Sequence, residues 1–216
     1  MGMDGLGMQN LTGDMRRSIA ERFARSGWVE MATGEEDYAV LGKCKGDLGL
    51  RIGFDLSMRE FGLSLNPSVG VHHGRVSALV GSLYGLSDGG FLVGSSLAGL
   101  FDAAGREGGL LPRWCVLSND DVDLVVDLLE SDIRAYAIPY FDGFSNFSDI
   151  ASSLKERPNI SQFELGRLAV VCAELGDLSS ARSAISSIRR LADFSSTFVA
   201  DQIRLFIGNF EKEYGC

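Results

Sequence analysis

The residues of this sequence best suited to chemistry are two adjacent histidines, His72 and His73, within the segment NPSVGVHHGRV. An imidazole titrates near neutral pH, so it can serve as a general base or as a metal ligand. Neighbouring residues on a strand point to opposite faces, which places the pair poorly for holding one metal ion. No HxH or HExxH motif supplies further ligands. We therefore predict no metal site and a structural or interfacial role, with a general base at His73 as the catalytic alternative.

Motifs for nucleophilic or phosphate chemistry are incomplete. The segment GSSLAG at 94–99 misses the GxSxG spacing by one residue, and GGFLVGSS at 89–96 has the glycines of a phosphate loop without its lysine. Four cysteines are widely spaced and form no CxxC, which favours reduced thiols over disulfides or a metal site. These cysteines are Cys44, Cys115, Cys172 and Cys216. The sequence predicts no catalytic residue, no cofactor and no enzymatic activity.

Carboxylates form the most distinctive cluster. The 216-residue chain has a net charge of −9, and residues 111–150 carry eight acidic and two basic side chains, which gives −6. No basic residue occurs between Ser118 and Ser131, and the calcium-loop pattern is incomplete because its glycine is missing. Two interpretations remain open, a solvated helix face or a docking surface for a basic partner. The acidic residues are Asp120, Asp121, Asp123, Asp127, Glu130 and Asp132.

The acidic balance also limits the partners and the location. Nucleic-acid-binding proteins usually present a basic stripe, so we expect no nucleic acid. No apolar run approaches the roughly 20 residues that span a bilayer, and the N-terminus lacks a basic segment followed by an apolar one. We therefore expect no membrane partner and a cytoplasmic location.

The elements that must position these residues follow from hydrophobic periodicity. Met15, Ile19 and Phe23 recur at helical spacing and predict a helix over 14–26, capped by Asp14 and ended by Gly27. The period then changes to two in three segments, which predicts a meander of three antiparallel strands with one solvated face. These segments are 37–46, 48–57 and 60–69.

The remaining elements are mainly helical. We expect Asn66-Pro67 to end the third strand or to introduce a bulge, and a helix to follow the histidines. The segment 118–141 contains the clearest helix, and Pro139 is expected to end it. A helical hairpin is joined at Gly176-Asp177, and a last helix covers about 195–212.

Together these patterns predict an α+β fold: an N-terminal helix packed on an antiparallel meander sheet, followed by a C-terminal helical hairpin region. We expect a helix-plus-sheet region at 1–117 and a helical region at 118–216, forming one compact unit.

This order of elements resembles that of bacterial immunity proteins of polymorphic and contact-dependent growth-inhibition toxins. The points of similarity are Pro67, Gly70, Val71 and His72 in NPSVGVHH, and Tyr136, Pro139, Phe141 and Phe144 in YAIPYFDGF. The resemblance implies a protein that binds a cognate, possibly basic, toxin domain and occludes its active site. The surface expected to bind comprises Asp120, Asp121, Asp123, Asp127, Glu130 and Tyr140.

Two other functions compete with this hypothesis. A helical adaptor or scaffold would use an apolar groove on the C-terminal hairpin. An enzyme would use His72 and His73 beside a carboxylate, in a pocket for which the sequence gives no sign. Phe141 and Phe144 are expected in the core rather than on the binding surface.

Overall fold

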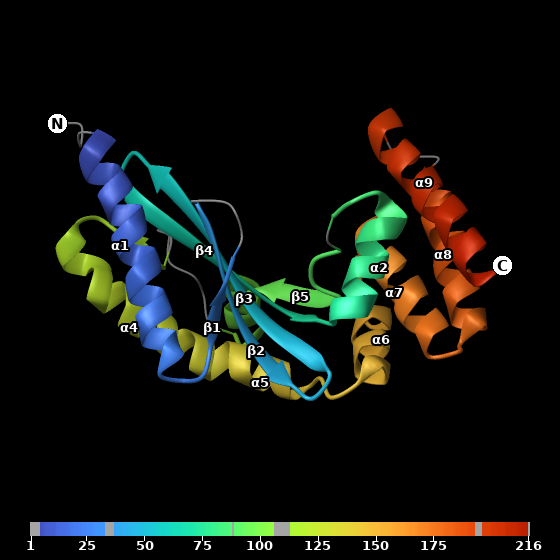
Figure 1. Ribbon diagram of the computed structural model, residues 1–216, viewed down its shortest axis with the longest axis horizontal. Helices are drawn as coiled ribbons and strands as arrows, with labels where there is room; N and C mark the ends of the chain where they lie inside the picture. Colours follow the sequence, from blue (N-terminus) through green and yellow to red (C-terminus); the bar gives the residue numbers. More distant parts are fainter. Residues whose placement is uncertain (1–4, 33–36, 88, 106–112, 193–195, 216) are drawn as a thin grey trace. The chain divides into compact units, whose positions relative to one another are not determined.

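The computed structural model describes residues 5–32, 37–87, 89–105, 113–192 and 196–215, with side chains from Leu11 onward (Figure 1). The chain forms two compact units, each assembled from three segments. The first unit comprises Met1–Lys45, Leu50–Gly70 and Gly94–Gly143, and the second comprises Gly46–Gly49, Val71–Val93 and Phe144–Cys216. The predicted helical region began at residue 118. The helix that follows this residue belongs to the first unit, together with most of the sheet.

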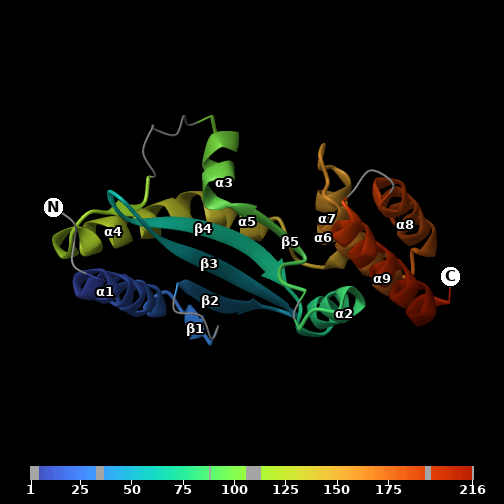
Figure 2. The same cartoon turned by 90° about the horizontal axis from the view of Figure 1, so that it is seen from above.

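The α+β fold predicted from the sequence is confirmed. Within the described residues an antiparallel sheet has the order β1-β2-β3-β4-β5, and β6 pairs with β4. Figure 2 shows its long strands from above, with α1 along one flank and α4 along the other. The strands are β1 (Val29–Met31), β2 (Tyr38–Lys45), β3 (Leu48–Arg59), β4 (Gly62–His72), β5 (Val93–Ser96) and β6 (Cys115–Val116). The predicted meander corresponds to β2, β3 and β4.

Alternation along the strands decides which face of the sheet is buried. On β3, Leu50, Ile52 and Phe54 point into the core, whereas Arg51 and Asp55 lie on the other, more solvated face. Side chains of one strand alternate between faces, so a single period-two pattern yields one apolar and one polar surface. The helices α1 and α4 cover the apolar surface.

Helix α1 (Gly5–Ala24) begins well before the predicted start. Its apolar stripe, which includes Met15, Ile19 and Phe23, is buried as expected, and the Phe23 ring lies 6.3 Å from that of Phe54 on β3. The prediction that Asp14 caps the helix is wrong, because Asp14 lies inside it and forms an ion pair with Arg17 one turn later.

The prediction that Asn66-Pro67 interrupts the third strand is also wrong. On the outer side of β4, Leu65 N–H donates to Trp114 O at 2.9 Å, and Leu92 N–H donates to Val71 O at 2.7 Å. Since backbone groups alternate in direction along a strand, the nitrogen of Pro67 faces the same side as that of Leu65. A residue without an N–H is tolerated there because neither bond depends on it.

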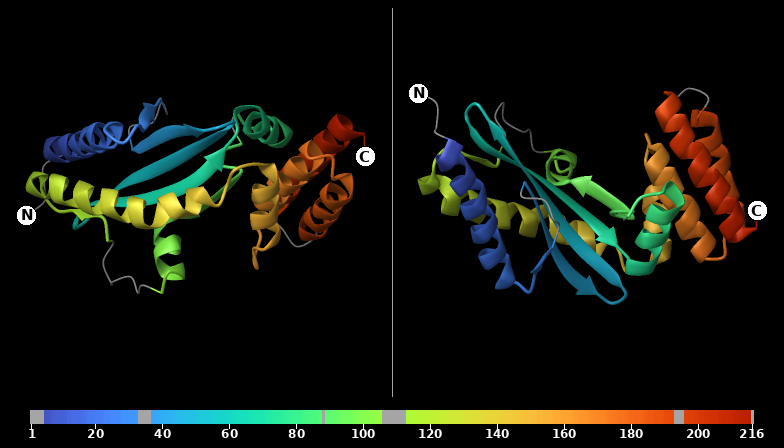
Figure 3. Two further views of the ribbon diagram at one scale, coloured as in Figure 1. Left: turned by 90° about the horizontal axis from the view of Figure 1, so that it is seen from below. Right: turned by 45° about the horizontal axis from the view of Figure 1, so that its top comes forward.

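The helical run after Ser118 passes through Pro139, so the predicted stop is wrong. A 3-10 turn (Asn119–Asp121) leads into α4 (Val122–Asp132), a π-helical turn (Ile133–Ala137) and α5 (Ile138–Asp142). Figure 3 shows α4 and α5 as one nearly straight rod. Ile138 N–H donates to Ile133 O across five residues, so the α-helical ladder changes register just before Pro139. A proline at that point removes no bond from a continuous ladder.

The second unit contains the predicted C-terminal hairpin. Helices α7 (Gln162–Glu174) and α8 (Leu178–Ala192) pack together, and Gly176 adopts a φ of 78° at their turn, a left-handed conformation that favours glycine. Helices α2 (Gly74–Tyr84), α6 (Phe147–Lys155) and α9 (Thr197–Tyr214) complete this unit. The Tyr84 ring of α2 stacks on Phe206 of α9 at 4.3 Å.

The two histidines end β4 and begin α2. The Nδ1 atom of His73 accepts a hydrogen bond from Val76 N–H at 3.3 Å, which makes His73 the N-cap of α2. Its own N–H donates to Ser77 Oγ at 3.3 Å, and its ring meets Phe147 edge-on at 5.0 Å. His72 is the last residue of the strand. The geometry therefore gives His73 a structural role, because it satisfies a helix-terminal N–H group.

Replacing His73 with Ala is expected to lower the free energy of unfolding by about 1–2 kcal/mol, since both the cap and the ring contact are lost. His73→Asn keeps a capping oxygen and should recover the larger part of that loss. Phe147→Leu, which removes only the ring contact, is the matched control. Urea unfolding followed by circular dichroism measures all three, and an Asn variant as unstable as the Ala variant would contradict the capping role.

Helix α7 begins with a capping box formed by Ser161 and Glu164, and this box predicts that the stability of the fold depends on pH. Burial of Glu164 acts to raise its pKa, but hydrogen bonds from Ser161 and the Arg157 guanidinium outweigh burial and hold the pKa below its usual value. A carboxyl group with a depressed folded-state pKa stabilises the fold above its unfolded pKa, and this contribution disappears as the pH falls through the folded value. Glu164→Gln should therefore be less stable than wild type at pH 7. The two stabilities should converge below about pH 4, as measured by urea titrations at several pH values, and a constant difference from pH 7 to pH 3 would refute this account.

Candidate functional site

The acidic cluster of the sequence lies along the 3-10 turn and α4, and its carboxylates divide into two groups. Asp121 closes the start of the helical run, because the N–H and Oγ of Ser118 both donate to its Oδ2 atom, at 2.9 and 3.0 Å. Asp127 and Glu130 form ion pairs with Arg22 of α1. These three residues contribute to the local structure of the first unit as well as to its surface charge.

The remaining carboxylates are exposed together with two leucines, and one of them, Asp123, also accepts a hydrogen bond from Ser18 Oγ of α1 at 3.4 Å. Asp120 and Asp123 are exposed, and Leu124 beside them leaves 71% of its surface accessible. Leu117, in the bend between β6 and the 3-10 turn, is 59% exposed. We name this surface the acidic face. It consists of Leu117, Asp120, Asp123, Leu124 and Asp127.

A buried carboxylate fixes the helix that carries the acidic face. Asp132 is only 4% exposed, and both its oxygens accept hydrogen bonds from Arg113, at 2.7 and 2.9 Å. Trp114 Nε1–H donates to Oδ2 at 2.9 Å. The Arg113 guanidinium also lies over the Phe101 ring, 4.7 Å from its centre. The end of α4 is thus tied to the segment that enters β6 and to α3 (Leu97–Ala103).

Tyr140 is not part of the acidic face. It lies on α5, thirteen residues after Asp127, which corresponds to roughly 20 Å along a helix. Its hydroxyl oxygen is buried, and its ring lies 6.0 Å from that of Phe141. Phe141 and Phe144 are both buried, so their expected place in the core is confirmed.

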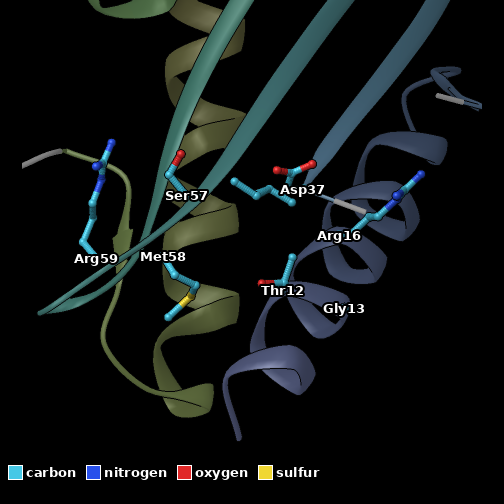
Figure 4. Close-up of a pocket in the computed structure, with 8 residues that line it drawn as sticks. Thr12, Gly13, Arg16, Asp37, Ser57, Met58 and Arg59 are labelled. Atoms are coloured by element: carbon cyan, nitrogen blue, oxygen red, sulfur yellow. The ribbon is translucent and has the colours of Figure 1, made fainter. Parts of the chain in front are cut away.

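The first unit also contains an open groove of about 860 Å³ (Figure 4). It runs between α1 and the end of β3, where Arg16 and Arg59 stand on opposite sides of Asp37. Its described lining has neither a histidine nor a cysteine, so it lacks the Ser–His or Cys–His pair of common nucleophilic sites. The lining residues are Thr12, Gly13, Arg16, Asp37, Leu56, Ser57, Met58 and Arg59.

Metal and thiol chemistry find no support among the described side chains. In that part of the chain, no group of three or more histidine, cysteine, aspartate or glutamate residues could hold a metal ion. Burial, followed by the charge of Asp121, raises the pKa of Cys115, and burial raises that of Cys172, which disfavours the reactive thiolate form. Nor does any helix of the described ranges combine the length and apolar character needed to cross a bilayer.

Comparison with protein-family models, with curated proteins and with solved structures finds no match. The function must therefore be argued from the residues and their geometry. Sequence reasoning located the acids but missed Leu117 and Leu124. For Leu124 the signal was present, because it falls outside the apolar stripe that predicts the buried side of the helix.

Removing the Asp132 carboxylate is expected to destabilise the first unit. Asp132→Ala leaves the buried Trp114 N–H without its acceptor and should lower the free energy of unfolding by about 2–3 kcal/mol. Asp142→Ala, an exposed acid on the same helical run, should change it by less than about 0.5 kcal/mol. Thermal unfolding at pH 7 measures both, and equal effects would show that the buried hydrogen bonds do not fix α4.

Proposed function

We propose that this chain is a binding protein whose acidic face captures a basic protein partner, and that the partner is a bacterial toxin domain neutralised in the cytoplasm. The observation that carries the proposal is Leu124. A leucine 71% exposed on a helix, with acids at positions 120, 123 and 127 around it, combines an apolar anchor with a charged border.

Such an arrangement matches the anatomy of protein interfaces. Binding energy concentrates in a few apolar or aromatic anchors, and polar residues around them exclude water and select the partner. Carboxylates at the border accelerate the encounter with a basic surface more than they strengthen the final complex. Leu124 would supply the anchor, and Asp120 and Asp123 the attraction.

The packing of α4 suits this role because it limits the entropy lost on binding. Asp132 fixes one end of the helix, the Ser118–Asp121 bonds fix the other, and Arg22 holds the flank. A surface that is already ordered in the free protein loses little freedom when a partner binds. Neutralisation would then be steric, because a toxin bound across α4 has its active site covered.

A helical adaptor is the second candidate, and one observation favours it. In the second unit, Phe198 on α9 is 71% exposed, as exposed as Leu124, and Leu205 lies two turns later on the same helix. A partner bound there would use the helical unit in place of the acidic face. The two functions therefore make opposite predictions for Leu124 and Phe198.

The test is capture of the partner from the native cells with the tagged chain, followed by expression of that partner alone and together with the chain. We expect a basic protein that stops growth alone and is tolerated when co-expressed. Leu124→Ala should weaken the complex by about tenfold or more. Asp120→Asn with Asp123→Asn should mainly slow association and reduce its dependence on salt. Calorimetry and stopped-flow measurements give these values.

Phe198→Ala is the matched control, since the two side chains are equally exposed and lie in different units. Loss of binding in this variant, with Leu124→Ala unaffected, would establish the adaptor in place of the immunity function. A captured partner that does not impair growth would contradict neutralisation even if it binds through the acidic face.

A further inference from the structure

Helix α8 has the opposite charge character to α4. Residues 178–192 contain three arginines and no acidic residue, although the chain as a whole carries −9. Arg182 and Arg189 lie on the exposed side of the helix, seven residues apart. The second unit thus presents a basic strip on a protein whose other charges are mostly acidic.

A groove of about 250 Å³ separates the two arginines, where α8 meets α9. Its apolar floor is formed by Ile185 and Phe210, and Ser186 adds a hydroxyl group to the wall. Glu211 on α9 lines the same groove and forms a 2.6 Å ion pair with Arg189. The arrangement is a small apolar hollow with a guanidinium group at each end.

We propose that this groove binds the acidic face of a second copy of the chain. The two surfaces match in order and in spacing. On α4, Leu124 lies between Asp120 and Asp127, and on α8 the hollow lies between Arg182 and Arg189. Seven helical residues span roughly 10 Å in each case, so two aligned helices bring each acid to an arginine while the leucine enters the hollow.

The charges already paired within one chain do not prevent this exchange. Asp127 contacts Arg22, and Arg189 contacts Glu211, but Asp127, Arg189 and Glu211 all keep 43–58% of their side-chain surface accessible. Exposed ion pairs contribute about 0–1 kcal/mol, so rearranging them costs little. The shared net charge of −9 repels two copies at long range. The association is therefore weak, depends on concentration and is sensitive to salt.

Self-association of this kind would regulate the proposed function, on which this part of the inference rests. A second copy seated on α4 covers Leu124 and the acids around it, so the binding surface is hidden until a tighter partner displaces the copy. The contact between copies itself does not require any toxin, and it is tested on the purified chain alone.

Sedimentation at 5–200 µM in 0.15 M and 0.5 M salt tests the contact. We expect the average mass of the wild type to rise with concentration and to fall toward one chain at the higher salt. Arg182→Glu with Arg189→Glu, and separately Asp120→Lys with Asp123→Lys, should each weaken the association at least tenfold. Asp127 is kept because it holds Arg22. Circular dichroism confirms that both variants remain folded.

A mixture of the two charge-reversed variants should associate again, since the unchanged acidic face of the arginine variant can bind the unchanged groove of the aspartate variant. Arg25→Glu with Lys212→Glu, which changes the net charge as much as the arginine variant does but at two other exposed positions, should not weaken the association tenfold. The proposal is overturned if the wild type keeps the mass of one chain at 200 µM, or if the two variants do not associate when mixed. Either result leaves the proposed binding of a toxin untouched, because that is measured with Leu124→Ala on the toxin complex.

Discussion

The surface on which both proposals depend is held by one buried carboxylate. Asp132 receives three hydrogen bonds from Arg113 and Trp114, so a charge that would be costly in the core is fully compensated. These bonds attach the last turn of α4 to the residues entering β6, while Arg22 attaches its outer flank to α1. Because the helix is held at its end and along its side, its solvent face presents a fixed pattern of leucines and acids.

Charge is distributed unevenly along the chain. On both α4 and α8, some charged side chains are paired within the chain and others are exposed to solvent. On α4, some carboxylates close the helix start or pair with α1, and others remain exposed around Leu124. On α8, Arg189 is paired with Glu211, whereas Arg182 stands exposed at the far end of the same groove. A cluster of like charges is therefore not in itself a binding surface. The acids and arginines that face solvent beside apolar groups are those that can attract a partner and then exclude water from the contact.

Three local predictions failed because tertiary context overrode a local signal. Asp14 has a capping side chain, but the apolar stripe of α1 extends back to Leu11, and burying it keeps the chain helical before the expected start. Pro67 breaks a ladder only where its nitrogen should donate, and neither the Leu65–Trp114 nor the Leu92–Val71 bond of β4 uses that nitrogen. Pro139 follows a π-helical turn that has already shifted the hydrogen-bond register. For the two prolines the deciding feature is the direction or register of backbone hydrogen bonds, which no local pattern records. For Asp14 it is the stripe from Leu11 to Phe23, whose first member the sequence-based prediction left out.

The sequence by itself determined the elements whose patterns repeat: the period-two strands of the meander, the stripe of α4 and the hairpin turn at Gly176. It determined these because alternation and helical spacing encode which side of an element must be buried, whatever the element packs against. The tertiary structure alone decided which acids pair with Arg22, that Asp132 is buried against Trp114, and that Arg182 and Arg189 border an apolar hollow. Those outcomes depend on which residues distant in the chain become neighbours, and the period of a single segment carries no information about its partners.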